Sequence, residues 1–362
     1  MVDVAKPHLS SFGSSPSISP KPAYPAFTTV ACVQAKSMLF STGFWGVLLC
    51  LWLEPTFAAI VFNLQKRGYS EALMFTIILN GMHSLQWVLT NVPLLYLDAT
   101  STLAEYKMHR ADGQKPSGGL MKEGLVTAAI VQLVLNPVLG FYLHTHWASL
   151  GLKSMRSSLP PVKDIFISLL IAHAFNDVFF YVAHRLFHSK SLYFLHKQHH
   201  QFAGTVGFAA EFANPVEVAI ANVFPTFYGC LFFGCKHPLV LLVWVTARLH
   251  ETYMAHSGYC FKDTWLDTIA LAHPYEAIHH DHHHTANRGN FGCLFTDWVF
   301  GTMDFYAQAG CWDGYLAKGK GKGTDESAVD ANASAANTST VKTSAAKRVG
   351  SPKKRSRSKG RK

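Results

Sequence analysis

Six long apolar stretches constrain the fold of this chain more than any other feature. They lie at about 38–62, 72–97, 125–142, 164–183, 215–235 and 238–255. Several approach the ~20 residues that a helix needs to cross a bilayer. Only 15% of the residues are charged, against roughly 25% in ordinary soluble domains. A soluble protein would seldom contain six such stretches, so we predict an all-α fold: an integral membrane helical bundle with about four transmembrane spans.

The formal net charge of +10 is confined to one end of the chain. Ten basic residues and no acidic one lie between Lys342 and Lys362, which leaves 22 basic and 22 acidic residues in the remainder. A neutral body does not favour nucleic acid as a partner, and none is predicted. Basic segments favour the cytosolic side of a membrane, so we expect the tail to be cytosolic.

Composition divides the chain into four parts. The segment 1–35 is rich in Ser, Pro and Ala and is predicted to be a disordered arm. Residues 36–160 form an N-terminal transmembrane region with a charged loop, and 161–312 hold most of the histidines. From residue 313 to 362 almost nothing apolar remains to be buried, so a disordered basic tail is predicted.

Histidine is the residue that points to chemistry. Fifteen of the 20 histidines lie between His173 and His284, mostly in the motifs HRLFH at 184–188, HKQHH at 196–200 and HHDHHH at 279–284. Spacings of three and four place imidazoles on one face of a helix. The seven cysteines, in contrast, are scattered without a CxxC pair and are expected to be reduced thiols.

Neutral imidazole is a common ligand of iron, zinc, copper and nickel, and nine or ten imidazoles exceed what one metal ion requires. We therefore predict two metal ions in a cap at the membrane surface. The apolar stretches 215–235 and 238–255 would form a hairpin that returns the chain to the same side. The predicted ligands are His184, His188, His196, His199, His200, His256, His279, His280, His283 and His284.

Other polar residues have weaker signals. Asp177 precedes His184 by two helical turns and is predicted to orient a ligand imidazole, the one catalytic-site role assigned outside the histidines. Glu211 and Asp281 are candidates for the same role. His282 is interpreted as a bystander, and His173, His250 and His273 as structural.

The order HxxxH, HxxHH, HSGY and HHDxHH resembles the fatty acid hydroxylase and sterol desaturase superfamily, which are membrane di-iron oxygenases of the endoplasmic reticulum. The likeness covers about residues 176–304. Within the superfamily, the chain most resembles the C-4 methylsterol monooxygenases. The segments that carry this resemblance are AEF at 210–212, NPVE at 214–217, WVTARL at 244–249, HSGY at 256–259 and GNFG at 289–292.

This resemblance implies that residues 161–312 are a catalytic domain holding a di-iron centre. The implied reaction uses O2 to oxidise an unactivated C–H bond of a lipid, here the C-4 methyl group of a sterol precursor, through alcohol and aldehyde to the carboxylate. The implied electron source is NAD(P)H, through a separate reductase and cytochrome b5, because neither His237-Pro nor His273-Pro continues into a haem-binding HPGG run. Other enzymes of sterol demethylation are the remaining expected partners.

Two departures from the family pattern affect the substrate. Methylsterol members usually have His where this chain has Asn214, and the closing block is shortened to DWVFGT at 297–302. Alternatives within the superfamily are a sphingoid-base or fatty-acid hydroxylase, a sterol side-chain hydroxylase and a sterol desaturase. A membrane zinc hydrolase or a metal transporter is the alternative from another class. Residence in the endoplasmic reticulum membrane, with the metal site and the tail cytosolic, follows from the resemblance and the charge pattern.

Overall fold

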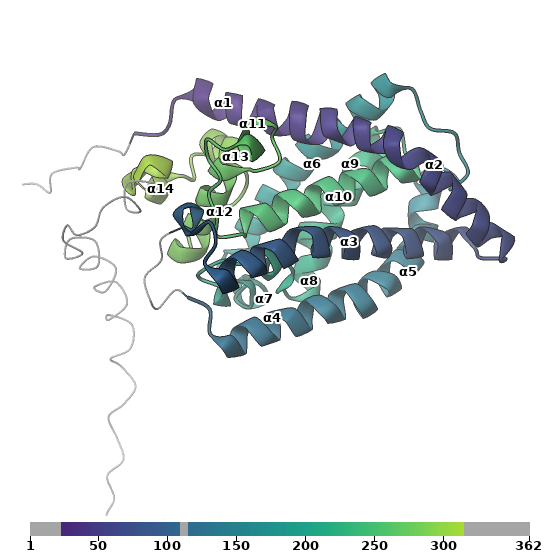
Figure 1. Cartoon of the computed structure of the whole chain (residues 1–362). Coiled ribbons are helices and arrows are strands. Elements are labelled where there is room, and N and C mark those ends of the chain that lie inside the picture. Colours follow the sequence, from purple (N-terminus) through teal and green to yellow (C-terminus); the bar gives the residue numbers. More distant parts are fainter. Residues whose placement is uncertain (1–22, 109–114, 315–362) are drawn as a thin grey trace, which may run out of the picture. The chain divides into compact units, whose positions relative to one another are not determined.

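The computed structural model describes residues 23–108 and 115–314, and every regular element in these ranges is a helix (Figure 1). π-Helical segments interrupt the long helices, short 3-10 segments lie between helices, and both kinds are labelled η. The elements are α1 (Phe27–Lys36), η1 (Ser37–Phe44), α2 (Trp45–Lys66), α3 (Glu71–Thr100), η2 (Ala104–Tyr106), α4 (Gly118–Ile130), η4 (Val131–Leu135), α5 (Asn136–Ser149), α6 (Val162–Phe187), α7 (Tyr193–His196), η5 (His199–Gln201), η6 (Gly207–Glu211), α8 (Pro215–Glu217), η7 (Val218–Val223), α9 (Phe224–Phe233), α10 (Pro238–Ala255), α11 (Trp265–Thr268), α12 (Pro274–Ala286), α13 (Leu294–Phe300) and α14 (Asp304–Gln308).

Among the described residues, five helical segments are long and apolar enough to cross a membrane, one more than the approximate number expected. They are Phe27–Lys66, Glu71–Thr100, Gly118–Ser149, Val162–Phe187 and Pro215–Phe233. Their outward faces carry large apolar side chains, among them Trp52, Leu133 and Tyr142, which are more than 70% exposed. Such a surface is stable against lipid but not against water. The chain is therefore a multi-pass membrane protein, as predicted.

Helix α10 forms the centre of the bundle. Its residues Leu239 to Val245 are all buried, and it packs against α2, α3, α6 and α9. Together with the segment from α8 to α9 it forms the expected hairpin, so that the chain returns to the end from which it left. This path brings the C-terminal end of α10 to the C-terminal end of α6.

Small residues allow the helices around α6 to approach closely. A Cβ atom at Gly46 would lie 2.7 Å from Leu169 Cδ1, and one at Gly229 would lie 2.7 Å from Phe175 Cβ. Close contacts at small residues are a main source of packing energy between helices in a membrane, where lipid is as apolar as leucine. The positions of α2 and α9 against α6 therefore depend on glycine.

The N-terminal helix begins earlier than the composition suggests. The segment 1–35 is predicted as a disordered arm, but α1 starts at Phe27 and continues through η1 into α2. It is held in place by the Phe27 ring, 5.0 Å from that of Trp298, and by Lys36, which donates to Asp267 Oδ1 at 2.6 Å. Residues 1–22 of the predicted arm and residues 315–362 of the predicted basic tail lie outside the described residues.

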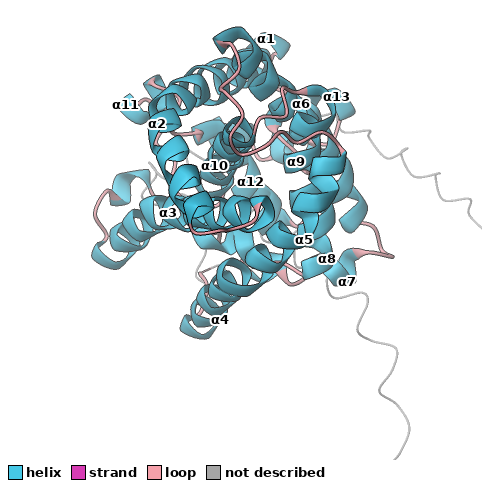
Figure 2. Cartoon of the chain, turned by 90° about the vertical axis from the view of Figure 1, so that its right-hand side faces the viewer, coloured by secondary structure: helices cyan, strands magenta, loops and turns pink. Residues whose placement is uncertain are grey.

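The short helices gather at one end of the bundle. In Figure 1, α7, α12, α13 and α14 lie towards the end where α6 and α10 finish, and Figure 2 gives the view along the bundle. Most of the histidines predicted as ligands are on these short elements or on the final turns of α6. The fold thus consists of a lipid-facing bundle and a polar cap.

Candidate metal centre

Two groups of histidine side chains converge in the cap. The five-histidine group consists of His184, His188, His196, His200 and His283. The four-histidine group consists of His199, His256, His280 and His284. Within each group the candidate ligand nitrogens all lie within 4.8 Å of one another. The histidine clusters are thus able to hold two metal ions, as predicted.

Helix α6 supplies the first two members of the five-histidine group. His184 lies in the last turn of the helix and His188 is its C-cap residue. The ring of His184 is oriented by its Nδ1, which donates to the carbonyl oxygen of Phe291 at 2.6 Å. Its Nε2 then faces Nε2 of His196 at 3.0 Å. The HxxxH spacing therefore places both imidazoles on the same side of the helix end, as helix geometry predicts.

The HKQHH segment does not form the single helix that its spacing predicts. Helix α7 ends at His196, and a 3-10 turn, η5, begins at His199. Because of this change, His196 and His200 point into the five-histidine group while His199 points into the four-histidine group. Nε2 of His200 lies 2.9 Å from Nε2 of His196. A continuous α-helix would have placed all three imidazoles on one face.

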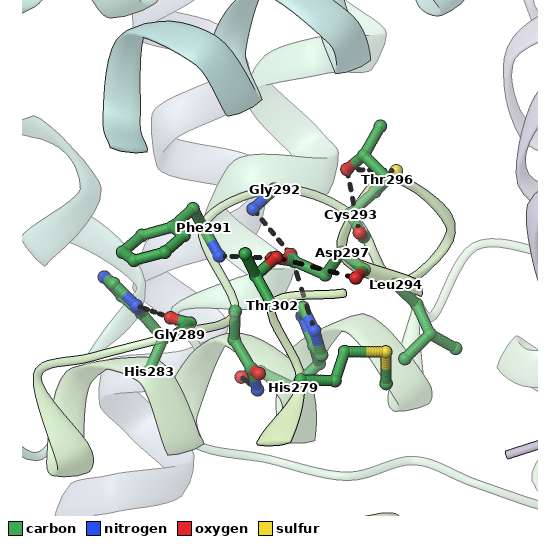
Figure 3. A network of polar contacts seen from close by, with 12 residues as sticks. His279, His283, Gly289, Phe291, Gly292, Cys293, Leu294, Thr296, Asp297 and Thr302 are labelled. Carbon is green, nitrogen blue, oxygen red and sulfur yellow. Dashed lines mark hydrogen bonds and ion pairs between the residues drawn. The ribbon is translucent and has the colours of Figure 1, made fainter. Parts of the chain in front are cut away.

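Helix α12 contributes to both groups. His283 joins the five-histidine group, whereas His280 and His284 join the four-histidine group. His256, which follows the last residue of α10, completes the four, with its Nε2 2.9 Å from that of His280. Nδ1 of His283 donates to the carbonyl oxygen of Gly289 at 2.6 Å (Figure 3). The loop after α12 therefore orients ligands from both α6 and α12.

His279 and His282 point away from both groups. The ring of His279 packs against Tyr306, with 5.3 Å between ring centroids, and its Nε2 lies 3.6 Å from Asp297 Oδ2 (Figure 3). His282 packs against the same tyrosine. This placement does not support His279 as a ligand, because residues one position apart on a helix point in directions about 100° apart. For His282 it agrees with the bystander interpretation.

The donor set fits metal ions on chemical grounds. His184 and His196 both donate from Nδ1, to Phe291 O and to Glu217 Oε1 respectively. Each Nε2 therefore carries a lone pair, and two lone pairs that face each other at 3.0 Å cannot hydrogen-bond. Neighbouring nitrogens around a metal ion, each about 2.1 Å from it, are separated by about 3 Å. A cation between them accounts for the arrangement.

Burial keeps the imidazoles neutral, the form that binds a metal. It lowers the pKa of His188 and of His199 to about 4 and that of His256 to about 3. The pKa values of His280, His283 and His284 are also far below the ordinary value, first because of burial and then because neighbouring imidazoles repel a second charge. The site is therefore ready to bind metal without releasing protons at neutral pH.

Glu217 is a functional candidate that the sequence analysis missed. It is the last residue of α8, it is 5% exposed, and it accepts a hydrogen bond from Nδ1 of His196 at 2.7 Å. A carboxylate in this position fixes the tautomer of a ligand imidazole and raises its basicity. The only sequence signal that includes it is the segment NPVE of the family resemblance.

The carboxylates proposed from the sequence have other partners. Asp177 lies 3.2 Å from His173, one helical turn earlier, and accepts from Gln34 of α1 at 2.7 Å. Among the described residues it forms no hydrogen bond or ion pair with a member of the two groups. Glu211 pairs with His83 at 2.9 Å, and Asp281 accepts from Thr205 at 2.9 Å. Among the described residues, neither Asp177 nor Glu211 forms a hydrogen bond with a candidate ligand.

Asp297 organises the loop that carries the orienting carbonyls. Its carboxylate is 0% exposed and accepts from the backbone N–H groups of Phe291 at 2.8 Å and Gly292 at 2.7 Å, and from Thr302 (Figure 3). Three donors to one buried carboxylate hold the loop in a single conformation. This conformation presents the carbonyl of Phe291 to His184.

Asn214, the departure from the expected family pattern, lies outside both groups. Its Oδ1 accepts from the backbone N–H of Val216 at 2.9 Å and so caps α8. Asparagine is among the preferred residues at this position of a helix. The departure from the family pattern therefore leaves the nine converging histidines intact and stabilises the helix that carries Glu217.

Comparison with known proteins agrees with this geometry. Residues 169–302, which include all nine converging histidines, match the family model named Fatty acid hydroxylase. Methylsterol monooxygenase 2-2 of Arabidopsis thaliana is 30% identical over 233 residues, which are 62% of this chain and 84% of the plant protein. The chain belongs to the fatty acid hydroxylase superfamily. It is a membrane oxidoreductase of that superfamily.

Other relatives of this hydroxylase-superfamily chain differ in their named activities. The C-4 methylsterol oxidase of Schizosaccharomyces pombe is 34% identical over 155 residues, 42% of this chain and 51% of the yeast protein. A very-long-chain aldehyde decarbonylase of Oryza sativa subsp. japonica is 29% identical over 250 residues, 67% of this chain and 90% of the rice protein. No solved structure matches the chain.

Proposed function

We propose that the chain is a di-iron oxygenase that oxidises the C-4 methyl group of a sterol precursor. The observation that carries this proposal is the convergence of nine histidine nitrogens, in two groups, within a membrane protein related to methylsterol monooxygenases. Two bound iron ions would supply the reduction of O2 and the oxidation of an unactivated C–H bond, which zinc, having no accessible redox change, would not.

The protein's own residues position and protect this chemistry. The five-histidine and four-histidine groups would hold the metals, and Glu217 would orient His196 through its Nδ1. We assign no role at the metal centre to Asp177, predicted to orient a ligand, or to His279, predicted to be a ligand. Asp297 would hold the loop at 289–292 so that the carbonyl oxygen of Phe291 accepts from His184. Fixed imidazoles bind metal without a large rearrangement, and burial keeps bulk water from the reacting centre.

Two adjoining cavities support a lipid substrate. One has a volume of about 140 Å³ and an apolar lining that includes Leu79, Leu143, Trp147 and Val245. The other, of about 80 Å³, is lined by polar residues and by His184, His196, His199, His256 and His280. An apolar cavity between membrane helices suits a substrate that enters from the bilayer. The carbon to be oxidised would occupy the polar cavity beside the histidines.

The remaining parts of the reaction lie outside this chain. We propose that electrons come from NAD(P)H through a reductase and cytochrome b5, and that other sterol demethylation enzymes use the product. We further propose residence in the endoplasmic reticulum membrane with the cap and the tail on the cytosolic side. The sequons at Asn332 and Asn337 provide a test of orientation, because glycans at either residue would place the tail in the lumen.

Expression in cells that lack their own C-4 methyl oxidase tests the proposal. Sterol profiling should show that 4,4-dimethyl sterols no longer accumulate when the chain is present. His199→Ala and His283→Ala, one from each group, should abolish this rescue at equal protein levels. Persistent 4,4-dimethyl sterols with full expression of the unaltered chain would refute the sterol assignment. Stoichiometric zinc without iron in active protein would refute the oxygenase assignment.

Aldehyde decarbonylation is the second candidate, because the rice relative so named matches this chain over 90% of its own length. The two reactions leave different products. Incubation of purified protein with a long-chain aldehyde, an electron donor and O2, followed by gas chromatography, would reveal a hydrocarbon one carbon shorter. Production of that hydrocarbon, together with no change in sterols, would favour the second candidate.

A further inference from the structure

Arg248 lies where the two cavities meet. The apolar and the polar cavity share the lining residues Phe180, Ala210, Ala221, Asn222, Arg248 and Thr252. Of these, only Arg248 carries a charge. It belongs to α10, two helical turns before His256, and its side chain is 20% exposed. A guanidinium in this wall would face any lipid that passes from the apolar cavity towards the histidines.

Aromatic contacts connect this guanidinium to the metal centre. Cζ of Arg248 lies 5.5 Å from the ring centroid of Phe180. The ring of Phe180 in turn lies 5.1 Å from the ring of His184, a member of the five-histidine group. Phe180 is one helical turn before His184 on α6, so this contact is fixed by the helix. Arg248 is therefore held close to the reacting end of the substrate, not at the far end of the apolar cavity.

The guanidinium retains hydrogen-bonding capacity. Its Nη1 lies 3.5 Å from Glu251 Oε2, and Glu251 is itself held by Ser37, whose hydroxyl donates to Oε1 at 3.0 Å. Within residues 23–108 and 115–314, Arg248 donates no hydrogen bond. A guanidinium has five N–H donors, so the ion pair with Glu251 leaves most of them available. An oxygen atom on the bound molecule could accept a charge-assisted hydrogen bond from one of them.

We propose that Arg248 is a specificity-determining residue that hydrogen-bonds an oxygen substituent of the lipid next to the carbon that is oxidised. The proposal rests on the proposed function and extends it to the substrate class. A sterol methylated at C-4 has its ring hydroxyl on the adjacent carbon, so one molecule can place the hydroxyl at Arg248 and the methyl group at the histidines. A hydrocarbon chain without such an oxygen would lack this hydrogen bond, and the guanidinium would keep only its ion pair with Glu251.

Binding of matched sterols tests the proposal without turnover. Full-length protein, purified with its metal in lipid nanodiscs, would be titrated with a radiolabelled 4,4-dimethyl sterol and with its 3-deoxy analogue. Charge-assisted hydrogen bonds correspond to about 10- to 100-fold in affinity. The unaltered protein should therefore bind the hydroxylated sterol by about that factor more tightly. Arg248→Gln should bind both sterols about equally, and Arg248→Lys, which keeps the charge, should retain part of the preference.

Asn176 provides the matched control. It lines the apolar cavity two helical turns before His184, and its Nδ2 has no hydrogen-bond partner among the described residues. Asn176→Val should keep the preference for the hydroxyl. Loss of the preference in Asn176→Val but not in Arg248→Gln would overturn the proposal, because the hydroxyl would then lie deeper in the cavity.

The comparison of the two sterols on unaltered protein can overturn the proposal even if a variant fails to fold. Equal binding of both sterols would overturn the role of Arg248 while leaving the sterol function standing. Binding of neither sterol would overturn the sterol function and the role of Arg248 together. The equality of both affinities in Arg248→Gln would also separate recognition from a structural role, since a structural defect would weaken both ligands by the same factor.

Discussion

Glu217 accepts a hydrogen bond from His196 Nδ1 at 2.7 Å and thereby directs Nε2 of that histidine into the five-histidine group. The two residues are 21 positions apart, one on α8 and the other on α7. A buried carboxylate in this relationship to a ligand imidazole sets both its tautomer and its orientation. Its removal should weaken metal binding without removing a ligand.

We expect Glu217→Ala to lower the affinity of the five-histidine group by about 10- to 100-fold, the effect usual for such partners. Glu217→Gln, which keeps an acceptor oxygen, should have a smaller effect. Metal content after dialysis against graded chelator concentrations measures this. Glu105→Ala, at an exposed residue, is the control and should match the unaltered protein. Full metal retention in Glu217→Ala would contradict the orienting role.

His279 and His280 are adjacent but point to different surroundings, so they form a matched pair. His280→Phe removes a member of the four-histidine group and should lower the metal content from two ions per chain towards one. His279→Phe keeps a ring against Tyr306 and should retain both ions. Elemental analysis of the purified variants measures this. Loss of metal in His279→Phe would restore His279 to the ligand set.

Asp297→Asn should loosen the loop that orients His184. An amide can no longer accept charge-assisted bonds from Phe291 N, Gly292 N and Thr302, and we expect a loss of about 1–3 kcal/mol in stability. The thermal unfolding midpoint in detergent measures this. Asp304→Asn, at a carboxylate whose hydrogen bond with Tyr24 is exposed, should change the midpoint much less. Equal midpoints for the two variants would argue against the role of Asp297 in holding the loop.

His273 gives a prediction for pH dependence. Burial lowers its pKa to about 4 in the folded protein, below the value of about 6.5 expected in the unfolded chain. The unfolded chain therefore takes up the proton first, and this group's contribution to stability is lost as the pH falls from about 6.5 to about 4. The loss should be on the order of 3 kcal/mol.

His273→Gln removes this titration. Unfolding of both proteins would be compared between pH 7 and pH 4, so that the effects of the other histidines cancel in the difference. The unaltered protein should lose stability relative to His273→Gln over that range. A constant difference between the two proteins across the range would show that His273 titrates normally.

The sequence was informative about the histidines because residue type and spacing both carry information there. The nine that converge were all among the predicted ligands, since a run such as HxxxH at the end of an apolar helix, followed by two HxxHH runs, is typical of metal ligands. Glu217 was not found because nothing in a linear pattern distinguishes it from the other acidic residues. Its pairing with His196 depends on where α8 packs, which is a tertiary property.

Two further differences between the sequence-based predictions and the structure also arise from tertiary packing. Asp177 is on the same helix as His184, but an i, i+4 partner, His173, and Gln34 from α1 are nearer. The sequence could not place Gln34 there, because α1 begins inside a segment whose composition is typical of disorder. Similarly, the change from α-helix to 3-10 turn between His196 and His199 overrides the spacing of HKQHH.

Because of that change of helix type, one peptide unit joins the two groups in the HKQHH segment, as another does between His283 and His284 of α12. His199 and His200 are consecutive, yet they belong to different groups. Occupancy of one group therefore fixes the backbone from which a ligand of the other group extends. Loading of the two sites should be cooperative, and a chain that has lost one ion should hold the second less tightly than an isolated site of the same composition would.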